Sequence, residues 1–351
     1  MFPYVLIICS HIADSAEISK SSAVLSLNFI SLGAYSSNMS NLNVAVIGPA
    51  DFARELGKKG TVSDITLYDL KQGKDTVTFI EASKYPERLA PLFFAVSMAD
   101  SAMVVIEEIN SQLGECIVML HAAGISHGYI ILRNYLTPEQ IAPLIKGTVL
   151  ESYTVVSEDM VALREQFLSD ARTLQDESDG ACSIPVDHFF NVKGVGTVIL
   201  GYVAAGKVSK HEDLKVLPTD KTAQVRSIQK HDDDYDEAFK GDRVGLALKN
   251  VTVENLDRGD VLTSDPNIKC TSDLETKLEL VPFWKSPIKE GMVLHIGHWM
   301  QFIPSRVESV SDEGKIKLTL EKPMVHLPGD KAVAMYLDGG KLRIVGSISL
   351  S

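Results

Sequence analysis

The chain has 351 residues, a formal net charge of -12, and 45% hydrophobic and 23% charged residues. This length predicts two or three domains, and the composition is typical of globular proteins. A general electrostatic nucleic-acid binder should be basic, so the acidic balance argues against that class. The four cysteines, at positions 9, 116, 182 and 270, show no C-x-x-C spacing. They therefore argue against a zinc site or a disulfide framework and suit a reducing cytoplasm.

The first 38 residues open with an apolar run, Phe2–Cys9, and continue Ser-rich without a clear period. The run is too short to span a membrane, and it lacks the positively charged start of a secretory signal. We therefore expect that Met39 is the native start and that residues 1–38 are a non-structural extension; a cleaved or anchoring segment is the alternative. We expect a cytoplasmic protein with no membrane partner.

Residues 39–180 alternate between β-like and helix-like runs. The expected strands are Val44–Ile47, Ile65–Tyr68, Thr76–Ile80, Met103–Ile106, Tyr129–Leu132 and Tyr153–Val156. The expected helices are Phe52–Lys58, Pro86–Met98, Ser111–Ala123, one that starts at Thr137, and Ser157–Leu174. Pro86 suits a first turn, Gly124 suits a helix end, and Thr137-Pro138-Glu139-Gln140 suits a capped start. This alternation predicts an α/β domain with a mostly parallel sheet.

The pattern changes near the polar stretch Gln175–Gly180. From Cys182 to Ser351, short runs rich in Val and Ile are separated by Gly, Asp, Asn and Pro, which is typical of β-barrels. A weaker break at Ser264–Thr271 divides this part in two. We therefore expect an α/β domain at residues 39–180 and β-barrels at residues 181–268 and 269–351.

Two stretches of the second segment, Ile184–Pro218 and Ala223–Leu262, closely resemble the second domain of translational GTPases. This family includes elongation factor Tu, elongation factor 1-alpha and the selenocysteine-specific factor SelB. The glycines fit a small barrel, because Gly194 and Gly196 suit a tight hairpin and Gly201 suits a close strand crossing.

The third segment continues this resemblance. Ser286–Val310 and Lys322–Leu350 resemble the third domain of elongation factor 1-alpha and SelB. The resemblance implies a P-loop-GTPase-like α/β domain with a mostly parallel sheet, followed by two antiparallel β-barrels. It is faintest in the first domain, where the nucleotide chemistry of the family would lie.

The first motif of such a GTPase is a phosphate loop, G-x-x-x-x-G-K-[ST], whose backbone N–H groups cradle the phosphates. Here the loop Gly48–Glu55 reads GPADFARE and includes Asp51. Ala53, Arg54 and Glu55 replace the second glycine, the lysine and the magnesium-binding hydroxyl. The proline after the first glycine removes another N–H. Glu55 would place an anion where the charge of the phosphates lies, so each change opposes phosphate binding.

The other motifs of the family are also changed. Glu81–Tyr85 replaces the D-x-x-G motif, and only 32 residues between Gly48 and Glu81 leave little room for a switch segment. Arg133–Leu136 replaces N-K-x-D, and Leu136 cannot accept hydrogen bonds from guanine. We therefore expect a degenerate nucleotide site with no catalytic residue, no GTP hydrolysis and no cofactor. Weak binding of GTP with Mg²⁺, or a divergent active GTPase, is the alternative.

In the resembled factors, the second-domain barrel receives the 3′ aminoacyl end of a tRNA. Gln229 corresponds to a glutamate of elongation factor Tu that accepts a hydrogen bond from the aminoacyl group. The candidate phosphate contacts are four basic residues, Arg226, Lys230, Lys249 and Arg258. The alternative is that each is a solvated basic residue of the surface. The candidate pocket comprises Gly194, Gly196, Thr197, Arg226, Gln229, Lys230, Lys249, Asn250 and Arg258.

Two further groups of residues invite a metal interpretation. His295 and His298 are three apart on an expected strand, so they point to opposite faces and favour a structural role. The acidic run Asp232–Glu237 favours a solvated loop over a cation site. We therefore expect no metal.

The functional hypothesis is a translation elongation factor-like protein that has lost GTP hydrolysis. Its expected partner is a tRNA, the ribosome or another translation factor, and we expect a monomer. Two alternatives remain open: a divergent but active GTP-binding elongation factor, and a protein-interaction scaffold with no RNA role.

Overall fold

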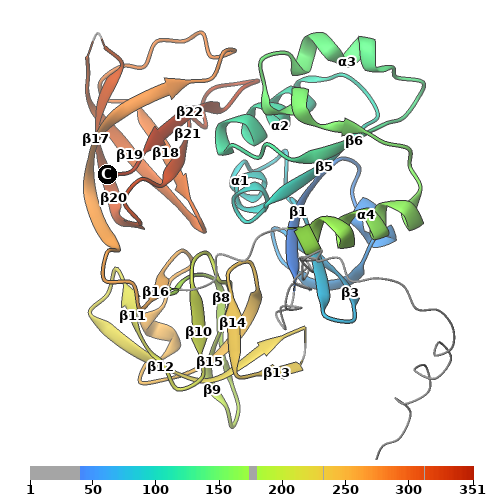
Figure 1. Cartoon of the computed structure of the whole chain (residues 1–351). Helices are drawn as coiled ribbons and strands as arrows, with labels where there is room; N and C mark the ends of the chain where they lie inside the picture. The colour runs from blue at the N-terminus through green and yellow to red at the C-terminus, as the bar shows by residue number, and fades with distance from the viewer. Residues whose placement is uncertain (1–39, 174–179, 232, 312) are drawn as a thin grey trace, which may run out of the picture. The chain divides into compact units, whose positions relative to one another are not determined.

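The computed structural model describes residues 40–173, 180–231, 233–311 and 313–351 (Figure 1). The extension predicted for residues 1–38, most of the polar break at 175–180 and residue 232 of the acidic run lie outside the described residues. The described residues belong to one compact unit. Along the chain they form an α/β region and then two β-barrels, as the sequence predicts. Within these ranges no helix is long and apolar enough to cross a membrane.

The α/β region is built on a seven-stranded sheet with the strand order β2-β3-β4-β1-β5-β6-β7. Strands β4, β1, β5, β6 and β7 are parallel, whereas β2 and β3 add to the edge in antiparallel fashion. The strands are β1 (Asn41–Ile47), β2 (Lys58–Val62), β3 (Thr66–Gln72), β4 (Asp75–Glu81), β5 (Ser101–Ile106), β6 (Gly128–Leu132) and β7 (Thr154–Val155).

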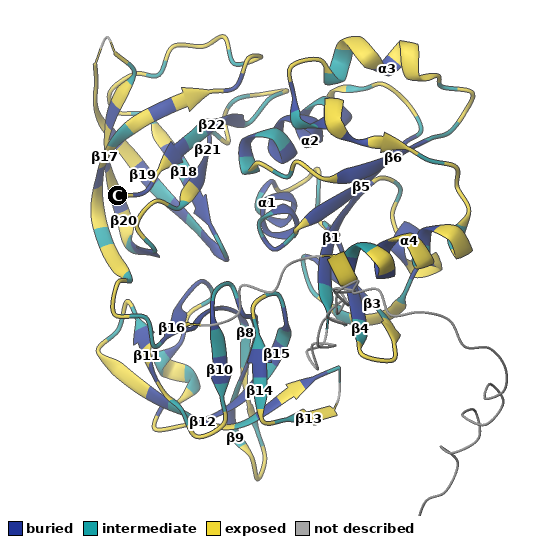
Figure 2. Ribbon diagram, in the orientation of Figure 1, coloured by how far each residue is buried: buried dark blue, intermediate teal, exposed yellow. Residues whose placement is uncertain are grey.

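Helices cover both faces of this sheet, so its central strands are buried, as Figure 2 shows for β1 and β5. Because side chains alternate along a strand, Ala45 and Ile47 of β1 join the core with α1, α2 and α3, whereas Val44 and Val46 join the core with η1 and α4. The helices are η1 (Phe52–Glu55, a 3-10 turn), α1 (Ala90–Ser97), α2 (Ser111–Ala123), α3 (Pro138–Ile145), η2 (Val149–Ser152) and α4 (Met160–Thr173).

The local helix signals are confirmed in two places. Helix α2 ends at Ala123 and is followed by Gly124 at φ 76°, a left-handed conformation that glycine adopts at no steric cost. The capping box of α3 pairs Thr137 with Gln140. Helix α4 begins at Met160, later than predicted, because Asp159 accepts hydrogen bonds from two N–H groups of its first turn.

Two expectations for this region were wrong in detail. The helix expected from Pro86 begins at Ala90, with Pro91 in its first turn, while Pro86 follows a cis peptide bond outside the helix. The helix expected at Phe52–Lys58 is only the turn η1, and Lys58 already starts β2. Strand β2 is mostly exposed; it lacks the alternating apolar pattern that reveals a half-buried strand.

The first barrel is antiparallel and follows the order β11-β16-β8-β9-β15-β12, closed by pairing of β11 with β12. Strand β13 pairs with β12 in antiparallel fashion, and β10 pairs with β14. The elements are β8 (Ser183–Val192), β9 (Gly196–Tyr202), β10 (Lys207–Ser209), β11 (Asp213–Leu217), β12 (Lys221–Lys230), β13 (Asp233–Tyr235), β14 (Glu237–Phe239), β15 (Arg243–Lys249), η3 (Val253–Asn255) and β16 (Val261–Thr263). The solvated loop predicted for the acidic run is therefore wrong where β13 and β14 form.

Three glycines of this barrel occupy positions that a side chain would strain, as predicted from the sequence. Gly194 and Gly196 have φ of 83° and 100° in the hairpin between β8 and β9. A Cβ atom on Gly201 would lie 2.4 Å from the carbonyl oxygen of Pro185. Any side chain at Gly201 would therefore push two paired strands apart.

The second barrel is a closed antiparallel barrel with the order β17-β20-β19-β18-β21-β22. Its core includes Leu294, Leu318 and Val345. The strands are β17 (Lys269–Leu280), β18 (Val293–His298), β19 (Gln301–Val310), β20 (Lys315–His326), β21 (Lys331–Met335) and β22 (Ile344–Ser349).

A buried carboxyl in the first barrel predicts a pH-dependent stability. Asp260 is 7% exposed and accepts the N–H of Asp257 at 2.8 Å, and burial raises the pKa of its carboxyl from 3.8 to about 6. A raised carboxyl pKa stabilises the fold below the unfolded value, and this contribution is lost as the pH rises through the folded value.

We therefore expect Asp260→Asn, which keeps an acceptor for Asp257, to raise the free energy of unfolding by on the order of 2 kcal/mol above about pH 6. Below about pH 4 the two proteins should differ little. Urea unfolding across this pH range measures the difference. A difference that does not change with pH would contradict the assignment.

Candidate functional site

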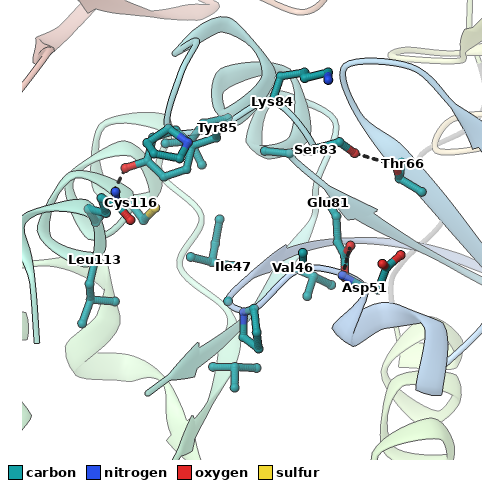
Figure 3. Close-up of a pocket in the computed structure, with 18 of the residues that line it drawn as sticks. Val46, Ile47, Asp51, Thr66, Glu81, Ser83, Lys84, Tyr85, Leu113 and Cys116 are labelled. Carbon is teal, nitrogen blue, oxygen red and sulfur yellow. Dashed lines mark hydrogen bonds between the residues drawn. The ribbon is translucent and has the colours of Figure 1, made fainter. Parts of the chain in front are cut away.

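A cavity of about 590 Å³ opens at the carboxyl ends of the parallel strands (Figure 3). Its walls include the loop after β1, the stretch after β4 and the loop after β5. Ligands of open α/β sheets bind at this edge. The cavity brings together Gly48, Asp51, Glu81 and Tyr85, which the sequence singled out from separate motifs.

The carboxylate of Glu81 occupies the phosphate-type loop. Its Oε1 accepts the N–H of Ala53 at 2.7 Å, and its Oε2 accepts the N–H of Asp51 at 3.1 Å. Glu81 is 9% exposed, and burial raises the pKa of its carboxyl while the two N–H groups act in the opposite direction. These N–H groups belong to the loop that would cradle phosphate in the resembled GTPases.

The expectation for Glu55 is corrected by this arrangement. Glu55 lies in the exposed part of η1 and is not among the residues that line the cavity. Arg54 is likewise exposed, while Ala53 is fully buried. The anion at the loop is therefore Glu81, because the tight turn of η1 directs Arg54 and Glu55 to solvent.

Asp51 has partners that the sequence did not reveal. The hydroxyl of Tyr68 donates to Asp51 Oδ1 at 2.7 Å, and Lys59 Nζ lies 3.4 Å from the same oxygen. These interactions, the Tyr68 bond foremost, lower the pKa of Asp51. Asp51 itself has φ 61°. Both partners come from β2 and β3, so they could have been found only from the pairing of these strands.

The opposite wall of the cavity is formed by residues after β4 and by α2. The Tyr85 hydroxyl donates to the carbonyl of Gln112 at 3.0 Å and to Glu115 Oε2 at 3.1 Å. Burial raises the pKa of Tyr85 and raises that of Cys116 to about 12. Both the Tyr85 hydroxyl and the Cys116 thiol are therefore neutral at this wall of the cavity.

The residues that replace the guanine-recognition motif pair with other loops. Arg133 Nη1 lies 2.8 Å from Glu107 Oε1, and its Nε lies 2.8 Å from Glu158 Oε2. The guanidinium also lies over the ring of Phe52, with its carbon 5.4 Å from the ring centre. Leu136 packs against the hydrophobic core. Arg133 thus joins the loops after β5, β6 and β7 and contacts η1.

Several candidate tRNA-contacting residues meet at one end of the first barrel. Arg226 Nη1 donates to the carbonyl of Val195 at 2.9 Å in the β8–β9 hairpin, which contains Gly194 and Gly196. Thr197 lies opposite Leu248 in the β9–β15 pairing. Lys249 and Asn250 follow at the exposed end of β15. The fold therefore assembles these stretches, which are far apart in the sequence.

A second cavity, of about 460 Å³, contains the predicted residue Gln229. Gln229 donates to Asp234 at 3.0 Å. Its other walls include His231 and Arg243 of the first barrel and Asp69 of β3. Sequence reasoning missed the last three because they become neighbours of Gln229 only through strand pairing and packing.

Lys230 and Arg258 do not fit the role of phosphate contacts. Lys230 is 2% exposed, and its Nζ lies 2.8 Å from Asp242 Oδ2. Arg258 lies 2.8 Å from Asp64 and 2.9 Å from Asp187. Both cations are thus paired with carboxylates, and we correct the expectation that they meet phosphate.

The candidate metal residues have structural partners. His298 Nε2 lies 3.0 Å from Asp330 Oδ2, and His295 stacks near Phe302 with ring centres 5.0 Å apart. Lys71 pairs with Asp233 of the acidic run at 2.8 Å. Among the described residues, no group of three or more His, Cys, Asp and Glu could hold a metal ion.

Comparisons with known proteins agree with this architecture. Residues 196–263 match the family model of elongation factor Tu domain 2. The chain is 40% identical over 310 residues to an uncharacterized protein of Methanocaldococcus jannaschii, MJ0325, covering 88% of this chain and 99% of that protein. It is 27% identical over 335 residues to the selenocysteine-specific elongation factor of the same organism, covering 84% and 71%.

Two solved structures share the fold. The translation elongation factor SelB from Methanococcus maripaludis, in complex with the GTP analogue GPPNHP, has a TM-score of 0.75 at 21% identity, covering 90% of this chain and 80% of that one. The bacterial selenocysteine-specific elongation factor EF-Sec has a TM-score of 0.75 at 19% identity, covering 89% and 58%.

A mostly parallel α/β sheet followed by two closed β-barrels defines an elongation-factor architecture. The chain belongs to the translational GTPase family and is an elongation factor-like member of the SelB and elongation factor 1-alpha type.

Proposed function

We propose that this protein has lost GTP hydrolysis and acts in translation by binding a tRNA, the ribosome or another translation factor. It works in the cytoplasm, as a monomer, and without a cofactor. Its domains are residues 39–180, 181–268 and 269–351.

The observation that carries the loss of GTP chemistry is the occupation of the phosphate-type loop by Glu81. The two N–H groups of Asp51 and Ala53 already have a carboxylate acceptor. A phosphate would have to displace this carboxylate or bind beside it. Binding beside it is unfavourable, because two negative charges in contact repel each other. The pairing of Arg133 with Glu107 and Glu158 supports the same conclusion at the guanine side.

The first barrel supports the binding role. Arg226 and Lys249 are exposed near the β8–β9 hairpin, and neither is buried in an ion pair as Lys230 is. Two bases beside a glycine hairpin can contact a nucleic-acid backbone without reading its sequence. The acidic balance of the whole chain then restricts this contact to a local surface.

Titration of tRNA at several salt concentrations tests this proposal. The logarithm of the affinity should fall linearly with the logarithm of the salt concentration, and Arg226→Ala or Lys249→Ala should each reduce the slope by about 1. Lys146→Ala, which removes an exposed lysine of the α/β region, is the matched control and should leave the slope unchanged. No interaction with tRNA at low salt would exclude the tRNA role and favour a protein scaffold.

A further inference from the structure

The loop Gly48–Glu55 is held by a carboxylate from a neighbouring strand. Glu81 is the last residue of β4, and the parallel register places it beside Val46 of β1. Because β1 runs directly into the loop, this register brings the Glu81 side chain to the loop backbone, as Figure 3 shows beside Asp51. The contact is therefore a consequence of strand pairing.

The geometry is that of an anion held by two backbone donors. Each oxygen of Glu81 accepts one N–H, and the Ala53 N–H is buried. Hydrogen bonds from N–H groups to a charged acceptor are stronger than neutral ones. A buried N–H that lost this partner would remain unsatisfied, which is costly.

We propose that the Glu81 carboxylate is a built-in replacement for a phosphate anion, which holds the Gly48–Glu55 loop in one conformation without any ligand. This inference rests on the proposed loss of GTP chemistry. It adds which group holds the backbone of the Gly48–Glu55 loop when no nucleotide is bound. In a nucleotide-binding loop of this kind, the backbone N–H groups are satisfied by the phosphates of a ligand that comes and goes. Here the ordering group is covalently part of the chain, so the loop has one state.

Hydrogen exchange of the Asp51 and Ala53 amides in the full chain tests the proposal. Glu81→Ala should increase the exchange rate of both amides by about 10- to 100-fold, because each loses a charged acceptor. Glu81→Gln keeps the size of the side chain and one acceptor oxygen, so it should increase exchange at one amide more than at the other. Glu55→Gln removes one negative charge from the loop itself but no acceptor of the Asp51 or Ala53 amide, so it should leave both rates unchanged.

Two results would overturn the proposal. One is an exchange rate in Glu81→Gln and Glu81→Ala that matches the wild type; the Gln variant preserves this test if the Ala variant does not fold. The other is a change in wild-type exchange on addition of inorganic phosphate, since the loop would then accept an external anion. Exchange is measured without nucleotide, so its outcome is independent of the tRNA titration that tests the proposed function.

Discussion

Fluorescent GDP or GTP, titrated with Mg²⁺, should show no saturable binding to this protein at concentrations up to about 1 mM. The chain lacks the loop lysine, the magnesium-binding hydroxyl and the guanine-binding aspartate, whose places hold Arg54, Glu55 and Leu136. Charged hydrogen bonds of this kind contribute about 1.5–3 kcal/mol each, so the three losses amount to a factor of about 10³ or more in Kd. The Glu81 carboxylate adds repulsion at the phosphate position.

A SelB protein handled in the same way is the positive control for this titration. Leu136→Asp restores only one of the three missing groups, the guanine acceptor, so it should leave binding undetectable. Its circular dichroism is compared with that of the wild type, because Leu136 packs against the hydrophobic core. Micromolar binding by the wild type would refute the degenerate site and support a divergent GTP-binding factor.

Replacing Glu115 should cause a large loss of stability, because this buried carboxylate accepts several hydrogen bonds. Glu115 of α2 is 4% exposed and accepts from the Arg343 backbone N–H at 2.8 Å and from its Nη2 at 2.6 Å. It also accepts from Tyr85. Glu115→Ala leaves the half-buried Arg343 guanidinium and the Arg343 N–H without their carboxylate, which costs up to about 3–5 kcal/mol. Urea unfolding, followed by circular dichroism, measures this loss.

Two further variants separate charge from packing at this site. Glu115→Gln keeps one oxygen that can accept hydrogen bonds from Arg343 or Tyr85, but it removes the charge. This variant should therefore lose less stability than Glu115→Ala. Glu115→Ala combined with Arg343→Met removes both charges and should recover part of the loss, because no unpaired ion remains buried. If the double variant lost as much stability as Glu115→Ala and Arg343→Met lose in sum, the two side chains would not be coupled, which would contradict the prediction.

The fold class could be predicted because the spacing of apolar residues along the chain follows which side chains are buried. The run Met103–Ile106 is apolar throughout, and β5 is buried on both faces. Helix α2 carries both its apolar positions and its glycine end in its own sequence. Strand β2 escaped prediction because its residues are mostly exposed and it forms by pairing with β3, a contact that its own sequence pattern does not show.

The candidate site divides in the same way. The loss of the nucleotide motifs was readable at Ala53, Arg54 and Leu136, since each motif is a contiguous string. The roles of Lys230 and Arg258 could not be predicted from sequence, because both cations pair with carboxylates that other strands or loops contribute. Burial, which decides whether a lysine is a surface base or half of an ion pair, depends on what packs around it.

Local sequence was therefore enough to establish the α/β and barrel order, the end of α2, the start of α3 and the departures from the family's nucleotide motifs. The identity of the anion at the loop required the folded chain. Glu81 and Ala53 are 28 residues apart, and the parallel pairing of β1 with β4 makes them neighbours. Sequence spacing specifies neighbours within a helix or a strand, whereas neighbours across a sheet are set by strand order and register.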